Sequence, residues 1–205
     1  MQTIDPYLLL LLLAAVFVLA FGGLGYLRRE GLSVQFALEA AAVTAILVGG
    51  SWLLGTPMHP FLFLGLLYLI TMRSRWIVEV ANRFAKRKNY DLAFRLYDLS
   101  LALRPDEATR LIVLANKGAA QVHSGQLEAA ITTLEGVLET EKSHRLGLKY
   151  EAACHYNLAY AYELKGQDAK ATVEYNEAIE VLPGSVYAKA AQAAMKRRKK
   201  KESSD

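Results

Sequence analysis

The first 72 residues of this 205-residue chain contain very little charge. Asp5, Arg28, Arg29, Glu30 and Glu39 are the five charged residues there, out of 44 in the whole chain. The overall values, a net charge of +4 and 53% hydrophobic residues, therefore describe neither part. A split this sharp excludes a single ordinary soluble domain and indicates a membrane part followed by a water-soluble part.

Cysteine is almost absent too, and so are the residue patterns of most enzymes. Cys154 is the sole cysteine, which excludes an intramolecular disulfide framework and is interpreted as a small core residue. The four histidines show no metal-ligand spacing. Gly22-Gly23-Leu24-Gly25 lies in an apolar run instead of following a strand, so it does not predict a dinucleotide loop. We expect no catalytic residue, no metal and no cofactor, and therefore no enzyme.

Apolar runs fill most of the first 72 residues. Residues 7–27 carry no charge and can cross about 30 Å of hydrocarbon; a cleaved signal peptide is the alternative, disfavoured because residues 1–6 hold no Lys or Arg. Residues 32–54 form a second run, and the two prolines and the glycine of residues 55–60 form a turn that ends it. Residues 58–74 form the third predicted span. A re-entrant or interfacial helix is the alternative there, because the apolar stretch 61–72 is short.

Basic residues beside these runs set the predicted orientation. Arg28 and Arg29 follow the first run and Arg73 and Arg75 the third, whereas residues 1–6 and 55–60 contain no Lys or Arg. The positive-inside rule then places the N-terminus outside, and the 28–31 loop and everything after residue 73 in the cytoplasm. Three spans satisfy this arrangement and two do not. We expect a multi-pass protein of the plasma (inner) membrane.

The second run carries a row of small residues at helical spacing. The row recurs every four residues and consists of Ala37, Ala41, Ala45 and Gly49. Small residues let another helix backbone approach closely, which is how helices associate in lipid. The row is predicted to pack either against the other spans of this chain or against a partner.

Two polar residues, Gln35 and Glu39, also lie inside the second predicted span. An ionisable group at that depth is costly and is by default a hypothesis about function. The alternative is a protonated, structural carboxyl that is hydrogen-bonded to Gln35, Tyr68 or Thr71 within a bundle of three helices.

The second part of the chain contains three related turn motifs: Lys88-Asn89-Tyr90-Asp91-Leu92-Ala93, Gly125-Gln126-Leu127-Glu128-Ala129-Ala130 and Gly166-Gln167-Asp168-Ala169-Lys170-Ala171. Small residues recur around them where paired helices would cross: Ala81, Ala93 and Ser100, then Gly118 and Ala130, then Ala159, Ala171 and Ala178. Large residues recur between these: Phe84, Tyr90 and Tyr97, then Leu127 and Leu134, then Tyr162 and Tyr175. Pro105 and Pro183 close the first and third units.

These residues resemble the tetratricopeptide-repeat (TPR) family, whose repeat is about 34 residues long. The chain departs from the family pattern at Gln121, Val137 and Lys142 in the middle unit and at Asp168 in the third. The resemblance covers about residues 74–186. It is specific for a fold and says little about a ligand; together with the apolar runs of the first 72 residues, it implies a membrane-anchored member of the family.

The predicted fold is therefore all-α, with an N-terminal three-helix transmembrane segment followed by a TPR-type α-solenoid of three repeats and a C-terminal capping helix. The predicted domains are residues 1–72, residues 73–195 with repeats from about residues 74, 111 and 152, and a basic tail, 196–205. Stacked repeats bury apolar faces that a single repeat cannot. No proline or glycine occurs between Gly65 and Pro105, so the third span should run into the first repeat helix with at most a small bend near Arg73.

The resemblance also implies a concave surface lined by the first helix of each repeat. The corresponding positions here are Val78, Asn82, Ala115, Asn116, Ala119, His123, Tyr156, Asn157 and Tyr160. The cations that clamp a terminal carboxylate in some family members are replaced by Val78, Ala153 and Asn157. Asn and Tyr beside small residues favour an extended peptide or a partner helix. The alternative is that some of these side chains only pack between repeats.

Six consecutive basic residues form the last candidate site: Lys196, Arg197, Arg198, Lys199, Lys200 and Lys201. They form a solvated tail, contact anionic lipid head groups together with Arg73 and Arg75, or contact a ribosome or nucleic acid. Residues 89–195 hold 10 basic and 14 acidic side chains, a net charge of −4. The basic overall charge therefore does not indicate nucleic acid.

The sequence predicts a membrane-anchored protein–protein interaction scaffold, an assembly factor or accessory subunit of a membrane complex. Its partners would be another protein, bound through the spans and the concave surface, and a bilayer with anionic head groups. One alternative is a small transport or signalling module centred on Glu39, with the repeats as regulator. Another is a tether of ribosome or nucleic acid through the basic tail.

Overall fold

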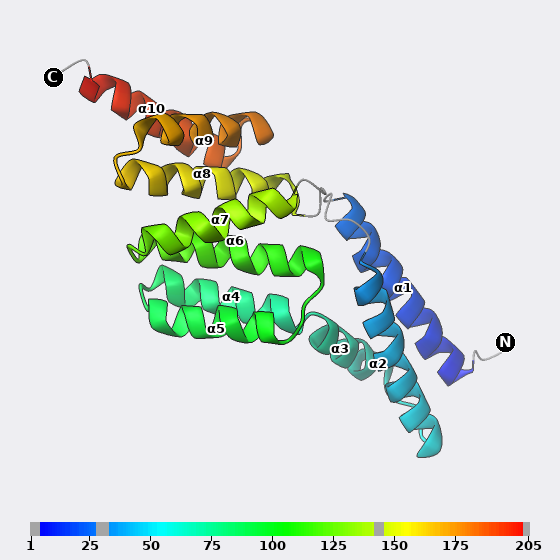
Figure 1. The fold of residues 1–205 in the computed structure, drawn as a ribbon. Helices are drawn as coiled ribbons and strands as arrows, with labels where there is room; N and C mark the ends of the chain where they lie inside the picture. Colours follow the sequence, from blue (N-terminus) through cyan, green and yellow to red (C-terminus); the bar gives the residue numbers. More distant parts are fainter. Residues whose placement is uncertain (1–4, 28–32, 142–145, 203–205) are drawn as a thin grey trace.

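The computed structural model describes residues 5–27, 33–141 and 146–202, and over these residues it is helical with no strand (Figure 1). The expected all-α class is confirmed. Arg28, Arg29 and Lys142, which the sequence interpretation used, lie outside the described residues. The described residues form ten helices: α1 (Pro6–Leu27), α2 (Val34–Leu53), α3 (Pro60–Thr71), α4 (Arg73–Lys86), α5 (Tyr90–Ala102), α6 (Glu107–His123), α7 (Leu127–Glu141), α8 (Leu148–Leu164), α9 (Asp168–Val181) and α10 (Val186–Glu202).

Helices α1 and α2 are long and apolar enough to cross a membrane, and local caps define where they begin. The Asp5 carboxylate accepts hydrogen bonds from the backbone N–H groups of Tyr7 and Leu8, at 2.9 and 3.0 Å. Ser33 Oγ accepts from the N–H of Phe36 at 3.1 Å. The two helices contain 22 and 20 residues, or about 33 and 30 Å at about 1.5 Å per residue.

Helices α1, α2 and α3 pack around their own apolar core. Its most buried large side chains are Leu10, Phe63 and Leu67. At the far end of the α2–α3 hairpin, Ser51 Oγ donates to the carbonyl of Thr56 at 2.7 Å and accepts from the N–H of Met58 at 2.9 Å. The outer faces are apolar as well, and Leu19 and Ile46 are 74% and 73% exposed. Apolar surface this extensive is unusual on a protein surrounded by water.

The chain bends by 67° between α3 and α4. The expected near-straight fusion of the third span with the first repeat helix is therefore wrong. Met72, with φ −99° and ψ 11°, separates the two helices. Ser74 and Ser100 hold α4 against α5 through two hydrogen bonds. Ser74 Oγ donates to the carbonyl of Ser100 at 3.3 Å, and Ser100 Oγ donates to the carbonyl of Ser74 at 3.1 Å. With α3 and α4 counted as one broken span, the described residues contain up to three candidate spans.

Three helix pairs, α4–α5, α6–α7 and α8–α9, turn back through the same backbone device. In each turn a left-handed residue follows the first helix, and the next N–H reaches back five residues to a carbonyl, as in a Schellman motif. The left-handed residues are Lys88, Gly125 and Gly166, with φ of 61°, 83° and 71°. The bonds run from Asn89 to Phe84, from Gln126 to Gln121 and from Gln167 to Tyr162, at 3.0, 2.9 and 2.9 Å. The turns lie at the three sequence motifs.

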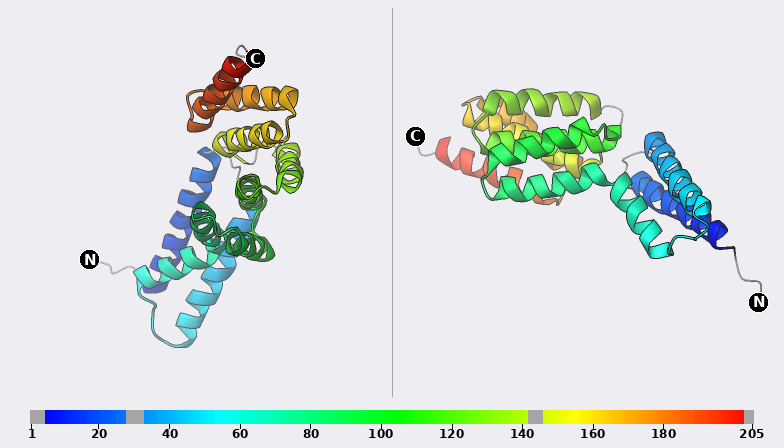
Figure 2. Two further views of the ribbon diagram at one scale, coloured as in Figure 1. Left: turned by 90° about the vertical axis from the view of Figure 1, so that its left-hand side faces the viewer. Right: turned by 90° about the horizontal axis from the view of Figure 1, so that it is seen from below.

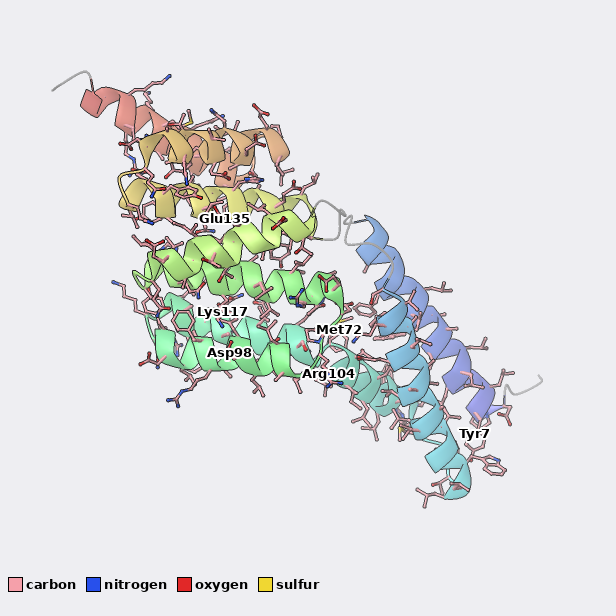
Figure 3. All side chains as sticks on the ribbon, in the orientation of Figure 1. Tyr7, Met72, Asp98, Arg104, Lys117 and Glu135 are labelled. Carbon is pink, nitrogen blue, oxygen red and sulfur yellow. The ribbon has the colours of Figure 1, made fainter. Side chains whose placement is uncertain are left out.

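The helices α4, α6, α8 and α10 form one side of the stacked array, each in contact with the next, and α5, α7 and α9 form the other (Figure 2). Fully buried alanines lie where the paired helices cross, among them Ala81, Ala93, Ala159 and Ala171. Gly118 lies where α6 crosses α7, and an added Cβ there would lie only 2.7 Å from Leu134 Cγ. An ion pair between Lys117 Nζ and Asp98 Oδ1, at 2.5 Å, links α6 to α5 (Figure 3).

The C-terminal helix α10 continues through the basic run to Glu202. Lys and Arg are good helix formers, so the run itself does not stop a helix. Arg198 fastens this part of α10 to α9, because its Nη2 lies 2.8 Å from Asp168 Oδ1 and its Nη1 donates to Thr172 Oγ1 at 3.2 Å. Residues 196–202 of the predicted tail are thus part of α10.

Candidate functional site

The predicted groove residues lie on α4, α6 and α8, and six of them retain exposed surface. His123 is exposed, and Asn82, Asn116, Ala119, Tyr156 and Tyr160 are half-buried. These residues lie on the side of the array formed by α4, α6 and α8, and α10 continues that side. These six positions are the part of the predicted groove that a partner can reach.

Val78, Ala115 and Asn157 are buried, with 3%, 5% and 7% of their surface exposed, which corrects their assignment to the groove. Val78 packs in the α4–α5 core beside Ala81 and Tyr97. Asn157 Nδ2 donates to the carbonyl of Ala153, 2.7 Å away and one turn earlier in α8. Because their side chains are buried within the array, these three residues contribute to its packing and present almost no surface to a partner.

The remaining groove asparagines are partly occupied by bonds within the array. Asn82 Oδ1 accepts a hydrogen bond from Tyr97 Oη at 2.6 Å, and Asn116 Nδ2 donates to the carbonyl of Ile112 at 2.7 Å. Burial of the Tyr97 hydroxyl, together with the charge of Glu79, raises its pKa to about 12. Each asparagine therefore keeps polar atoms for a partner but holds a fixed orientation.

Aromatic rings connect the groove positions of α6 and α8 to α10. The His123 and Tyr160 rings lie 6.3 Å apart, centroid to centroid. Tyr156 lies 5.9 Å from Tyr175 of α9 and 6.1 Å from Tyr187 of α10. Tyr187 was not among the predicted groove residues, although its place in the apolar stripe of the last helix was recognisable from the sequence. The usable surface thus extends beyond the third helix pair.

The row of small residues on α2 faces away from the other described helices at its centre. Ala41 and Ala45 are exposed, and Ala37 and Gly49 are half-buried. The face of α2 that packs against α1 and α3 is a different one, with Ala40, Thr44 and Ser51 buried. Packing among the described helices therefore does not account for Ala41 and Ala45.

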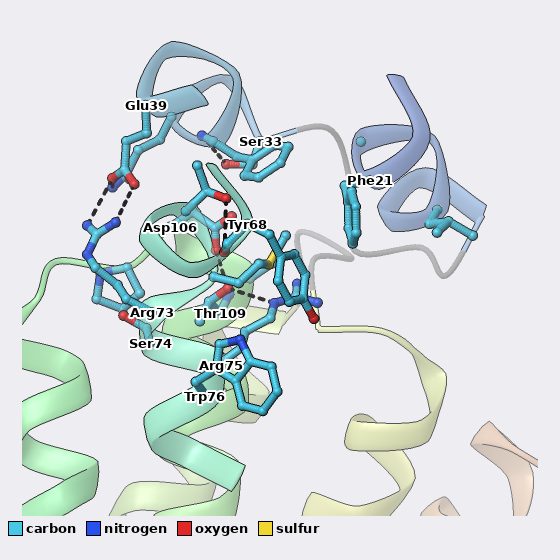
Figure 4. Close-up of a pocket in the computed structure, with 18 of the residues that line it drawn as sticks. Phe21, Ser33, Glu39, Tyr68, Arg73, Ser74, Arg75, Trp76, Asp106 and Thr109 are labelled. Atoms are coloured by element: carbon cyan, nitrogen blue, oxygen red, sulfur yellow. Dashed lines mark hydrogen bonds and ion pairs between the residues drawn. The ribbon is translucent and has the colours of Figure 1, made fainter. Parts of the chain in front are cut away.

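Glu39 is joined to the first residue of α4 by an ion pair with two contacts. Arg73 Nη1 lies 2.7 Å from Glu39 Oε2, and Arg73 Nη2 lies 3.3 Å from Oε1 (Figure 4). Gln35 Nε2 donates to Glu39 Oε1 at 3.1 Å, as one interpretation of the sequence expected, and also to the carbonyl of Arg104 at 2.8 Å. Arg73 Nη2 reaches the carbonyl of Leu103 at 3.1 Å. These contacts, which we call the junction, tie α2 to both α4 and the end of α5.

Sequence reasoning did not pair Glu39 with Arg73. The proposed partner Thr71 instead donates its Oγ1 hydrogen to the carbonyl of Leu67 at 2.7 Å, within α3. Arg73 was assigned to the lipid surface, and the 67° bend that turns it toward α2 has no local signal. The available clue was the presence of opposite charges near the same end of two neighbouring spans.

A cavity of about 350 Å³ lies beside the junction, between the apolar helices and the start of α4 and α6 (Figure 4). Phe21, Tyr68 and Trp76 supply apolar walls. Arg75 Nε donates to Thr109 Oγ1 at 3.3 Å across the cavity. Arg73 and Arg75, predicted to face lipid head groups, therefore turn toward the protein.

The basic residues of α10 divide into two groups. Lys196, Arg197, Lys199 and Lys200 are exposed, whereas the Arg198 side chain is only 14% exposed. Lys201 lies outside the described side chains. In all three views α10 lies at the opposite end of the molecule from α1–α3 (Figure 1, Figure 2). Over the described residues, no group of His, Cys, Asp or Glu side chains is placed to hold a metal ion.

Comparison with known proteins gives a limited match. No protein-family model and no solved structure matches the chain. A stretch of 94 residues, 46% of the chain, is 31% identical to Heat shock protein STI1 of Saccharomyces cerevisiae, and the chain spans 15% of that protein's length. This similarity and the all-helical structure fit a TPR-like family, and they support binding to other proteins in general terms.

Proposed function

We propose that this chain is a membrane-anchored protein–protein interaction scaffold. Three spans in the plasma (inner) membrane would hold a TPR-type solenoid of three repeats, capped by α10, in the cytoplasm. The observation that carries the proposal is the junction: the Glu39–Arg73 ion pair and the bond from Gln35 to Arg104 fasten the array to an apolar helix. An array held in this way presents its surface at a defined angle to the bilayer.

The arrangement of α2 and α3 supports three crossings. The turn at Ser51 and Met58 joins one end of the pair, and Arg73 meets Glu39 near the other end, so α3 returns along most of α2. Helix α3 has 12 residues, about 18 Å of rise, which is shorter than an average hydrocarbon core. Local bilayer thinning accommodates such a short span at modest cost.

The three matching turns and the row α4–α6–α8–α10 support the repeat assignment. A solenoid of this kind has a concave surface that suits an extended peptide or a partner helix. The groove positions that retain exposed surface, among them His123 and the half-buried Tyr160, lie on this row. The partner would therefore meet the array through its concave side.

The exposed centre of the small-residue row supports a second contact inside the membrane. Ala41 and Ala45 let a foreign helix approach the α2 backbone closely, which is the main source of helix association in lipid. A chain with one contact in the bilayer and another in the cytoplasm suits an accessory subunit or assembly factor of a membrane protein complex. Glu39, held by Arg73 and Gln35, then has a structural role in the junction and needs no transport function.

Purification of the full chain in mild detergent, with identification of proteins that copurify in stoichiometric amount, tests the proposal. Ala41→Leu with Ala45→Leu should lose a partner that wild type retains, because the added side chains separate the helices. Ala42→Leu, on an exposed neighbouring face of α2, is the matched control and should keep it. His123→Ala with Tyr160→Ala should weaken the cytoplasmic contact. The absence of any stoichiometric partner, or wild-type behaviour of both pairs of substitutions, would contradict the proposal.

A further inference from the structure

The last helix of the array has a fixed position. Ala188, Ala191 and Ala194 are fully buried along its inner face, and Arg198 continues that face with its bonds to Asp168 and Thr172 on α9. The basic run is thereby ordered on a helix that packs on both α8 and α9. Charged side chains presented by an ordered helix can form a site of definite shape.

A shallow hollow of about 530 Å³ lies where α10 meets α8. It is lined by Tyr156 from α8 and by Ala190, Ala193, Lys196, Arg197 and Lys200 from α10. The α10 residues recur at helical spacing and therefore share a side of that helix. Two alanines leave room for a backbone to approach, and three cations border this room.

The Tyr156 ring joins the cations to the remainder of the groove. Tyr156 is half-buried, its ring lies 6.1 Å from that of Tyr187 at a tilt of 45°, and it is on the same helix as the groove residue Tyr160. The positive charge of Arg197 acts on the Tyr156 hydroxyl and partly offsets the burial that raises its pKa. Arg197 is therefore close enough to act electrostatically on a group bound at Tyr156.

The charges of the hollow select among possible occupants. Three cations with no acid among the lining residues favour an anionic occupant. The bilayer that α1–α3 would span is disfavoured as the occupant of the hollow, because α10 lies at the opposite end of the molecule from these helices (Figure 1, Figure 2). A nucleic acid carries charge along its whole length and is disfavoured, because the three cations cover only a short stretch and residues 89–195, which precede them, carry a net charge of −4. An acidic polypeptide segment fits the charge, the small alanines and the continuity with the groove.

We infer that the hollow between α8 and α10 binds an acidic, extended segment of the partner protein, with Lys196, Arg197 and Lys200 facing its carboxylates. The segment continues along the concave side toward Tyr160 and His123. This inference rests on the proposed scaffold function and adds the chemical class of the segment that the array recognises. Lys199, exposed on the same helix but outside the hollow, takes no part.

Fluorescence anisotropy on the full chain, reconstituted in nanodiscs of phosphatidylcholine, tests the inference. The probes are a labelled peptide of alternating Glu and Leu and a matched peptide of alternating Gln and Leu. The Glu peptide should bind about tenfold more tightly or better, and its binding should weaken as salt rises. The triple variant Lys196→Glu, Arg197→Glu, Lys200→Glu should remove this preference. Lys199→Glu should change the affinity less than about twofold, because exposed charges outside a contact contribute little.

A further variant separates shape from charge. Ala193→Trp fills the hollow without changing the charge and should weaken binding of the Glu peptide about tenfold, with circular dichroism unchanged from wild type. Equal affinity for the two peptides would overturn the inference, and so would an equal loss in Lys199→Glu and the triple variant. Tighter binding to phosphatidylserine vesicles or single-stranded RNA than to the Glu peptide would assign the cations to membrane or nucleic acid. If a partner still copurifies with the full chain when the peptide results contradict this inference, the proposed scaffold function is retained and only the acidic-segment site is rejected.

Discussion

At the scale of single residues, the charged groups near the apolar helices are matched to one another. Glu39 and Arg73 have side chains that are 30% and 32% exposed and meet through two contacts. Removing one member of a sheltered ion pair leaves the other without its partner, which is more destabilising than removing both. The pair therefore contributes mainly by fixing where α2 and α4 meet.

A double-mutant cycle measures this contribution. Glu39→Gln and Arg73→Gln should each lower the free energy of unfolding of the full chain in mild detergent, and the double variant should lose less than their sum. The expected coupling is about 1 kcal/mol or more. The exposed pair Glu107–Arg110, at 3.1 Å within α6, is the matched control and should show about 0.5 kcal/mol or less. Equal couplings in the two cycles would remove the special role of the junction.

Tyr97 gives a second prediction, for alkaline pH. Burial raises its folded-state pKa to about 12 from an ordinary value of 10.0, so the unfolded chain ionises first as pH rises. The stability contributed by the neutral hydroxyl is complete below about pH 10 and falls between about pH 10 and 12. Subtracting the tyrosinate absorbance titration of Tyr97→Phe from that of wild type should isolate a group titrating near pH 12. A difference centred near pH 10 would contradict the buried environment.

At the scale of elements, close helix crossings depend on the size of a single side chain. Gly118 on α6 faces Leu134 on α7, and an added Cβ would meet both Cγ and Cδ2 at 2.7 Å. Gly136, in the middle of α7, is exposed, and an added Cβ there would have nothing within 4 Å. The two glycines therefore separate packing from helix propensity.

The same substitution should act in opposite directions at these two positions. Gly118→Ala should destabilise the full chain by about 1–3 kcal/mol, because the crossing has no room to adjust freely. Gly136→Ala should stabilise it by about 0.5–1 kcal/mol, because alanine favours a helix. Thermal unfolding followed by circular dichroism measures both. Stabilisation by Gly118→Ala would mean that α6 and α7 pack less closely than described.

Local sequence signals predicted some elements well and others not at all. Apolar runs mark where α1, α2 and α3 lie, the prolines and glycine of residues 55–60 mark the turn between α2 and α3, and the turn motifs mark Lys88, Gly125 and Gly166. The bend at Met72 contains neither proline nor glycine. It is held instead by long-range hydrogen bonds, from Ser74 to Ser100 and from Arg73 to Glu39. Contacts between residues so far apart cannot be read from a local pattern.

The groove was predictable only as a set of positions. The resemblance to the TPR family put Val78, Ala115 and Asn157 on the concave surface, but their burial depends on how closely the neighbouring helices approach. The basic run was recognised as a charged segment, whereas its place beside Tyr156 depends on the docking of α10 by Arg198. In both cases the missing information was tertiary.

At the scale of the whole molecule, two unlike parts are joined at a fixed angle. The apolar helices expose hydrophobic surface, the array exposes charge, and the junction of Gln35, Glu39 and Arg73 connects them. A scaffold with this design needs the array on one side of the bilayer and the α2–α3 turn on the other. That sidedness is the central requirement of the proposed function.

Labelling of single cysteines in intact cells measures the sidedness directly. The native Cys154 is buried and is replaced by alanine, and cysteine is then introduced at Thr56 in the α2–α3 turn or at Gln192 on α10, both exposed. A membrane-impermeant maleimide should label Thr56→Cys in intact cells and Gln192→Cys only after lysis. Labelling of Gln192→Cys before lysis, or protection of both positions until lysis, would contradict a cytoplasmic array held by three spans.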